Sequence, residues 1–169
     1  MTGSALARIL WRLGEHEQAL EVMAHAVATV DRLGTGSPAR GHAEALVRGG
    51  AALIELDAGH PEEARRHVVA AYPAAVGTDD GPVVALAGLA VAALALHDGA
   101  PRNAAEILGA AARLRGSADR TSPEVVALTA RLRDELGDAA FEAAFAAGRA
   151  LDRDAALARL EPASYTLRP

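Results

Sequence analysis

The stretch LDAGHPEEARRHVVAAY, residues 56–72, joins a signal for the end of one helix to a signal for the start of another. Gly59 tolerates the left-handed backbone that ends many helices, and Pro61 lacks an N–H that the first helical turn leaves unpaired. Glu62 and Glu63 add negative charge in that first turn, where the helix dipole favours it. The stretch therefore predicts two helices joined by a short turn.

The same punctuation recurs in RLGEHEQALEVMAHA (12–26) and HDGAPRNAAEILGAA (97–111). In each copy an alanine follows the glycine by five residues, another follows seven residues later, and a small residue stands seven residues before the glycine. Small side chains let two helices approach closely, and a single hairpin cannot bury its apolar face. The frame therefore predicts three stacked antiparallel hairpins, marked by Ala7, Gly14, Ala19, Ala26, Ala52, Gly59, Ala64, Ala71, Ala92, Gly99, Ala104 and Ala111.

Composition also favours helices. The chain of 169 residues has 43 Ala, the best helix former, and only 3% aromatic residues. The apolar run at 83–96 is too short to span a bilayer and predicts a helix buried on all sides. Since no segment alternates apolar and polar residues at length, the chain is predicted to be all-α. Further helix ends are predicted at Gly34 and Gly116, and proline-marked starts at Ser37–Pro38, His60–Pro61, Gly81–Pro82, Ala100–Pro101 and Ser122–Pro123.

Charge and cysteine content exclude several classes of protein. The formal net charge is −5, all 17 basic residues are Arg, and their clusters are short, which argues against direct nucleic-acid binding. The absence of Cys excludes disulfides and thiolate metal sites. The N-terminal stretch lacks the basic and apolar regions of a signal peptide. These observations predict a cytoplasmic protein without membrane contact, and they leave a homo-oligomer possible.

This sequence frame resembles the tetratricopeptide repeat (TPR). It consists of a small residue, a Gly seven positions later, an Ala five positions after the Gly and a second Ala seven positions after the first. The resemblance implies one TPR-like α-solenoid domain over residues 1–160, in which antiparallel hairpins are stacked and a C-terminal hairpin caps the stack. The glycines stand 45 and 40 residues apart, whereas TPR repeats span about 34 residues, so longer helices and turns are expected. The implied segments are repeats at about 1–34, 38–77 and 81–116, capping helices at about 122–160 and a tail at 161–169.

The C-terminal third suggests a narrower resemblance. Residues 107–125 and 136–160 are similar to the C-terminal region of SARP/AfsR-like and LuxR-type ATPase transcriptional regulators of actinobacteria. In those proteins a helical-repeat region accompanies an ATPase and a DNA-binding domain. A Walker A loop requires Lys, which this chain lacks, and no helix-turn-helix follows Leu160. The resemblance therefore implies a terminal piece or a stand-alone relative of such a regulator.

The TPR resemblance also implies a binding surface, because the first helix of each repeat lines the concave groove. Such a groove, basic at one end and apolar beyond, suits an amphipathic helix or an acidic, apolar peptide. Trp11 is equally compatible with core packing, and His97 fits a core position better than a groove position. Plain interhelical packing accounts for the leucines better than a groove does. The implied groove residues are Arg8, Trp11, Arg12, Leu53, Leu56, Asp57, Leu89 and His97.

These patterns lead to three functional hypotheses. The first is an interaction module of a transcriptional regulator that binds a peptide, a partner protein or its own ATPase domain. The second is a small-molecule sensor with a ligand enclosed between Trp11, the third-repeat helix and Phe141 or Phe145. The alternative role of the two phenylalanines is to close the end of the helical stack. The third is a stand-alone TPR adaptor.

Catalytic patterns are missing from the sequence. The serines lie at predicted helix starts or in loops without a GxSxG elbow, and the six His form no HxxxH or HExxH motif. The acidic pair Glu62–Glu63 is explained by its place in a first helical turn. The sequence therefore predicts no enzyme, no cofactor and no metal.

Overall fold

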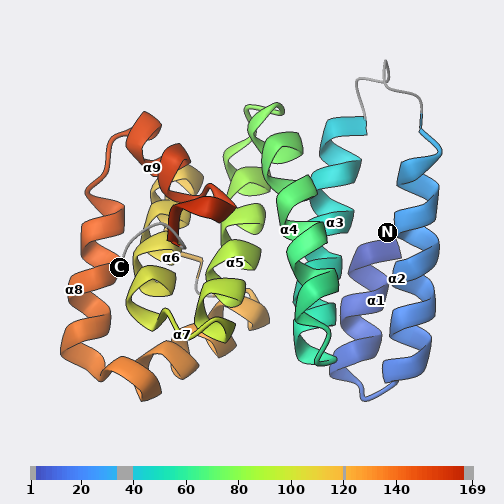
Figure 1. The fold of residues 1–169 in the computed structure, drawn as a ribbon, viewed down its shortest axis with the longest axis horizontal. Coiled ribbons are helices and arrows are strands. Elements are labelled where there is room, and N and C mark those ends of the chain that lie inside the picture. The colour runs from blue at the N-terminus through green and yellow to red at the C-terminus, as the bar shows by residue number, and fades with distance from the viewer. Residues whose placement is uncertain (1–2, 34–39, 120, 166–169) are drawn as a thin grey trace.

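The computed structural model describes residues 3–33, 40–119 and 121–165, and within these residues every regular element is a helix (Figure 1). The predicted all-α class is confirmed. The predicted stop at Gly34 and start at Ser37–Pro38 lie outside the described residues. The helices are α1 Gly3–Arg12, α2 His16–Asp31, α3 Arg40–Asp57, α4 Pro61–Val76, α5 Gly81–His97, α6 Pro101–Arg115, α7 Pro123–Leu136, α8 Asp138–Arg149, α9 Arg153–Arg159 and the 3-10 helix η1 Pro162–Tyr165.

The first three helix pairs reverse direction through equivalent turns. Gly14, Gly59 and Gly99 have φ angles of 85°, 81° and 76°, in the left-handed region that favours glycine. In each turn the glycine N–H donates to a carbonyl three residues earlier at 3.1 Å. The N–H of the next residue donates to the carbonyl five residues before it, at 2.8 to 3.0 Å. These are the two hydrogen bonds of a glycine C-cap, so the helix–turn–helix units predicted from the three glycines are confirmed.

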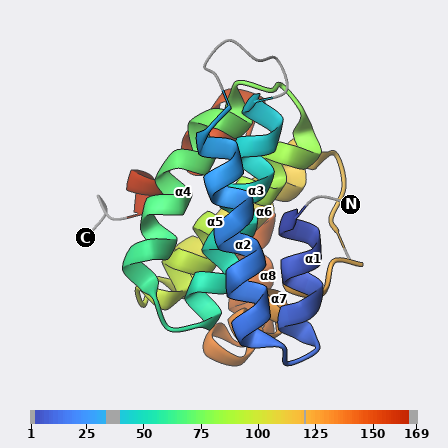
Figure 2. The same cartoon turned by 90° about the vertical axis from the view of Figure 1, so that its right-hand side faces the viewer.

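The alanines of the repeat frame lie where helices meet. Exposure of the nine alanines ranges from 0% to 9%, as their spacing predicts. The pairs α1–α2, α3–α4 and α5–α6 stand side by side, with α3 against the first pair and α5 against the second (Figures 1 and 2). Methyl-sized side chains at these contacts allow the close approach of neighbouring helices.

Helix α5 lies in the middle of the molecule and is apolar almost all round. Twelve of its residues are buried, which confirms the buried helix predicted from the run at 83–96. Asp80 caps its N-terminus by accepting a hydrogen bond from the Val83 N–H at 3.3 Å, and Pro82 occupies the first turn. Across the described residues, no helix is both long enough and apolar enough to cross a membrane.

The C-terminal helices depart from the hairpin pattern. Helix α7 runs across the lower end of the stack, whereas α8 stands upright at its outer edge and packs on α6 (Figure 1). Gly137 between them has φ 77° and ψ 156°, and α8 begins directly at Asp138 without an intervening turn. The two helices therefore cap the stack at an angle to each other, and the expected capping hairpin of antiparallel helices is wrong in this respect.

The contact between α6 and α8 depends on two glycines. A Cβ added to Gly148 would meet the carbonyl oxygen of Glu106, and one added to Gly109 would meet the carbonyl oxygen of Phe145. The two backbones thus touch where neither helix has a side chain. This contact holds α8 beside the third helix pair.

Part of the segment expected to be a tail packs against the helices. Tyr165 in η1 is 4% exposed, and its hydroxyl donates to Asp98 Oδ2 at 2.8 Å. Burial and this hydrogen bond raise the pKa of Tyr165 to about 12. Nearby, the buried guanidinium of Arg159 donates to Asn103 Oδ1 at 2.8 Å and to Glu106 Oε2 at 3.1 Å. These contacts fix the C-terminal helices to the third pair.

The raised pKa of Tyr165 predicts a loss of stability at alkaline pH. Unfolded tyrosine releases its proton near pH 10, whereas folded Tyr165 retains it to about pH 12. The free energy of unfolding is therefore expected to fall as pH rises from about 10 to about 12. Tyr165→Phe is expected to lose about 1 kcal/mol at pH 7 and to flatten this alkaline dependence, as measured by urea unfolding at several pH values. An unchanged alkaline slope would contradict the prediction.

Candidate functional site

All eight groove residues predicted from the sequence line a single cavity of about 180 Å³. Helix α1 contributes Arg8, Trp11 and Arg12, and α3 and α5 contribute the remaining five. The first helices of the three pairs therefore share one surface, as the TPR resemblance implies for a concave face.

Helix α7 forms the opposite wall of this small cavity. Its residues Glu124, Ala127, Leu128 and Arg131 lie on one helical face, and Leu128 is 4% exposed. The groove is thus covered by a helix of the same chain, an arrangement that the sequence reasoning missed. The only signal at Glu124 was an acidic residue in a helical first turn, which carries no information about its distant partners.

Two arginines of α1 hold Glu124. Arg8 Nε donates to Glu124 Oε1 at 2.9 Å, and Arg8 Nη2 lies 2.6 Å from Oε2. Arg12 Nη1 donates to Oε1 at 2.7 Å. The Ser122 hydroxyl donates to Oε2 at 2.9 Å. Burial alone would raise the pKa of Glu124, but the Arg8 hydrogen bond and charge, a backbone N–H and Ser122 together lower it to about 2. The carboxylate is therefore ionised at neutral pH and tightly paired.

The remaining predicted groove residues differ in exposure. Leu53 and Leu89 are buried and belong to the core as well as to the cavity wall. Trp11 is half-buried and its ring stacks on His16 at 4.3 Å between centroids. His97 is exposed and lines the cavity, so the alternative of a core histidine is wrong.

Asp57 stands at the edge of the small cavity, across from α7. The pKa of its carboxyl is raised, chiefly because the group is partly buried. The charge of Arg131 opposes this rise and the charge of Glu124 adds to it. The groove therefore carries both signs of charge, because Arg8, Arg12 and Arg131 line it together with Asp57 and Glu124.

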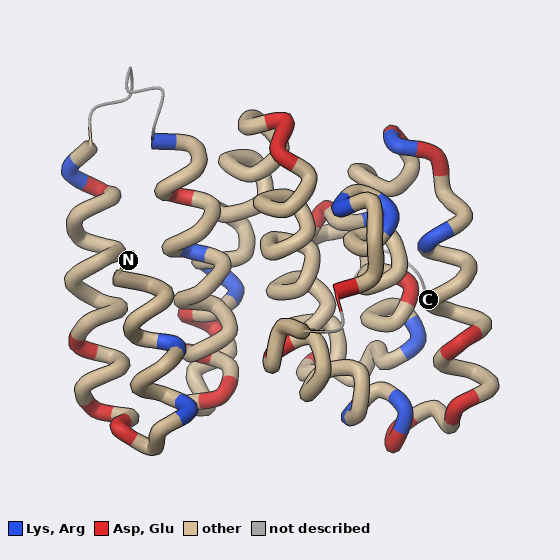
Figure 3. The backbone as a smooth tube through the Cα atoms, turned by 180° about the vertical axis from the view of Figure 1, so that it is seen from behind, with Lys and Arg blue, Asp and Glu red and all other residues tan. Residues whose placement is uncertain are grey.

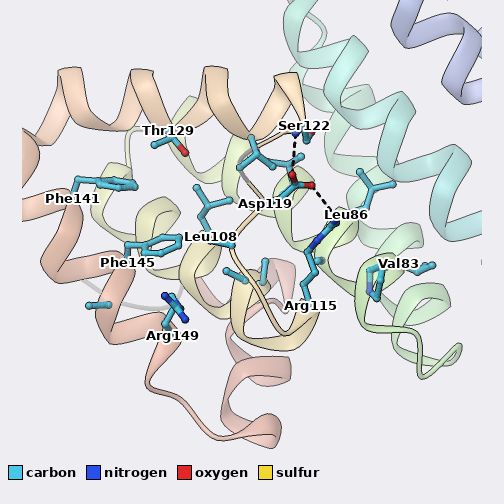
Figure 4. A pocket seen from close by; sticks show the side chains of 18 of the residues that line it. Val83, Leu86, Leu108, Arg115, Asp119, Ser122, Thr129, Phe141, Phe145 and Arg149 are labelled. Carbon is cyan, nitrogen blue, oxygen red and sulfur yellow. Dashed lines mark hydrogen bonds and ion pairs between the residues drawn. The ribbon is translucent and has the colours of Figure 1, made fainter.

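A second, larger cavity of about 800 Å³ lies on the other side of α7 (Figure 4). It is bounded mainly by α5, α6, α7 and α8, and Arg8 of α1 and Leu46 of α3 also line it. Phe141 and Phe145 of α8 stand opposite Val83 and Leu86 of α5 (Figure 4). The two phenylalanine rings stack with centroids 5.7 Å apart. The sensor hypothesis placed Trp11 and Phe141 or Phe145 around one ligand, but Trp11 lines the small cavity and both phenylalanines line the larger one. Helix α7 separates the two.

Ion pairs occupy most of the charged groups around the larger cavity. Arg115 lies 3.2 Å from Asp119, which also accepts hydrogen bonds from the N–H groups of Thr121 and Ser122. These backbone hydrogen bonds lower the pKa of Asp119. Arg133 pairs with Asp138 and Glu142, and its guanidinium lies 4.6 Å from the Phe141 ring centroid. The cavity thus has apolar walls with a charged and largely paired rim.

In the described part of the chain, residues of the two charges are not gathered on separate sides of the molecule (Figure 3). Arginines and acidic residues both occur near each end of the molecule, and α5 carries neither (Figure 3). No group of three or more His, Cys, Asp or Glu in the described part of the chain is arranged to hold a metal ion. The chemistry offered by the described cavities is recognition through apolar walls and arginines.

No protein-family model matches the chain, and no curated protein or solved structure is significantly similar to it. The features of the molecule that bear on function are the two cavities and helix α7 between them.

Proposed function

We propose that the chain is a TPR-like helical-repeat module that binds a partner helix along α1, α3 and α5, as the regulatory region of a transcriptional regulator or as an adaptor. The three equivalent turns and the side-by-side packing of the helix pairs are consistent with a TPR-like solenoid. The repeat frame and the C-terminal pattern support the likeness to actinobacterial regulators. The partner helix would come from another protein or from a neighbouring ATPase domain.

One observation carries this proposal: α7 occupies the predicted groove as a helix. It places an acidic side chain on Arg8 and Arg12, and it buries Leu128 against the neighbouring apolar wall. A partner helix with one acidic residue followed by an apolar residue four positions later would make the same contacts. Because both helices need the same surface, α7 and the partner would exclude each other.

Competition between α7 and a free peptide tests the proposal. The probe is a fluorescent peptide with the sequence SPEVVALTARLRDEL, residues 122–136, offered to the full chain. Glu124→Arg places a third cation beside Arg8 and Arg12 and should loosen α7. The variant is expected to bind the peptide at least about tenfold more tightly than wild type does, as measured by fluorescence anisotropy.

Glu135→Arg is the matched control, because Glu135 is an exposed α7 residue that lines neither described cavity. This control should bind the peptide as weakly as wild type. Trp11 is the single tryptophan and lines the groove, so its emission reports independently whether the peptide reaches that surface. Equal peptide affinity of the Glu124→Arg and Glu135→Arg variants would refute the proposal.

A further inference from the structure

The larger cavity has the size and walls of a small-molecule site. Its volume of about 800 Å³ lies within the range of about 300 to 1,000 Å³ typical of ligand pockets. Leu86, Leu108 and Phe145 supply apolar surface, and small residues such as Ala146 and Ala150 leave the space between them unfilled. An apolar molecule would replace water along these walls.

Most of the charges around this cavity are paired, and the remaining one is positive. Four arginines and two acidic residues line it, although the chain as a whole has a formal net charge of −5. Arg8 is held by Glu124, and Arg115 and Arg133 are held by the carboxylates described above. With Glu124 and Asp138 counted as partners of Arg8 and Arg133, these carboxylates equal the arginines in number, and the ion pairs leave Arg149 as the remaining cation of the lining.

Arg149 differs from the other three arginines. Its side chain is exposed and makes no hydrogen bond or ion pair with any other residue of the described part of the chain. It projects from α8 on the same side of the cavity as Phe145, across from Leu86 (Figure 4). A guanidinium offers two parallel N–H donors that match a carboxylate, so this site has an apolar wall beside one available anion receptor.

We propose that this cavity binds an apolar monocarboxylate, with the apolar body between α5, α6 and α8 and the carboxylate on Arg149. One unpaired guanidinium matches one carboxylate, whereas a cationic amphiphile would meet like charge at the rim. This site lies on the other side of α7 from the groove, and the proposal does not depend on a partner helix.

Displacement of a fluorescent fatty acid tests the site directly. The probe is 11-(dansylamino)undecanoic acid, used with the full chain below the concentration at which the probe self-associates. Its emission is expected to rise and shift to the blue on binding. Decanoate is expected to displace it at a concentration at least about tenfold lower than decanol, because only decanoate offers a carboxylate to Arg149.

Substitutions test the charge of Arg149 and the space inside the cavity separately. Arg149→Glu should weaken decanoate binding at least about tenfold and leave decanol binding within about twofold. Arg102→Glu makes the same charge change at an exposed α6 position outside the cavity lining and should leave both unchanged. Ala146→Trp fills the cavity from the exposed side of α8 and should remove binding of both competitors.

Each variant is compared with wild type by circular dichroism and urea midpoint, so that misfolding is recognised. If Ala146→Trp is misfolded, Ala150→Leu fills the same cavity from an exposed position and takes its place. The proposal fails if wild type does not bind the probe. It also fails if Arg149→Glu and Arg102→Glu bind decanoate equally, or if a folded, filled variant still binds the probe.

Discussion

Gly148→Val is expected to destabilise the chain by about 3 kcal/mol or more. Any side chain at this position meets the Glu106 carbonyl oxygen of α6, and a main-chain atom cannot rotate away as a side chain can. Helix α8 must therefore move off α6 or the chain must unfold. Urea unfolding followed by circular dichroism measures the loss.

Ala147→Val is the control for this substitution, because it adds the same β-branched side chain one residue earlier at an exposed position of α8. Its effect is expected to stay within about 0.7 kcal/mol, the range of helix propensity. The close contact between α6 and α8 would be refuted if both variants unfolded at the same urea concentration.

Glu124→Gln is expected to reduce the free energy of unfolding by about 3 kcal/mol at pH 7. The substitution removes the charge that Arg8 and Arg12 bind, and the Glu124 carboxylate side chain is only 17% exposed. A shift of the pKa from 4.5 to about 2 corresponds to a stabilisation of the same size, about 3 kcal/mol.

The lowered pKa of Glu124 also determines how its contribution to the free energy of unfolding depends on pH. The folded-state pKa of Glu124 is lowered, so its stabilisation is present above pH 4.5 and is lost as pH falls through about 2. Other carboxylates titrate in this range, so the readout is the difference between wild type and Glu124→Gln in urea unfolding. That difference should shrink from pH 5 to pH 2, and a constant difference would contradict the role assigned to Glu124.

The helix pairs were predictable because their signals are local. Gly59 and Pro61 are two residues apart and set one turn, and the spacing of Ala64 and Ala71 marks one face of a single helix. The backbone can adopt only a few conformations at such positions, so the sequence specifies them directly. The pairing of Phe141 with Phe145 is equally local, since one helical turn separates them.

The position of α7 was not predictable in the same way. It depends on Arg8 meeting Glu124, which lies 116 residues away in the chain. Many arginines and carboxylates offer equivalent pairs, and helical periodicity says nothing about which helices face each other. The angle between α7 and α8 likewise follows from Gly137 and from the contact of Gly148 with α6, neither of which has a distinctive local pattern.

The eight positions predicted as a groove therefore lie together, whereas the helix that covers them was not predicted. All eight positions follow from the helical register once the repeat frame is recognised, and they line one cavity. The larger cavity was anticipated only through Phe141 and Phe145, because the space beside them depends on how α7 and α8 are placed.

Contact of α7 with the first helix also bears on how the chain unfolds. In an open array each repeat touches only its neighbours, so end repeats can fray independently of the rest. Here the Arg8–Glu124 pair joins α1 to a helix that follows the third pair, and α7 also packs on α5 and α6. Loss of the N-terminal pair would remove support from the C-terminal cap as well. The contact thereby links the two ends of the array and favours unfolding of the chain as one cooperative unit.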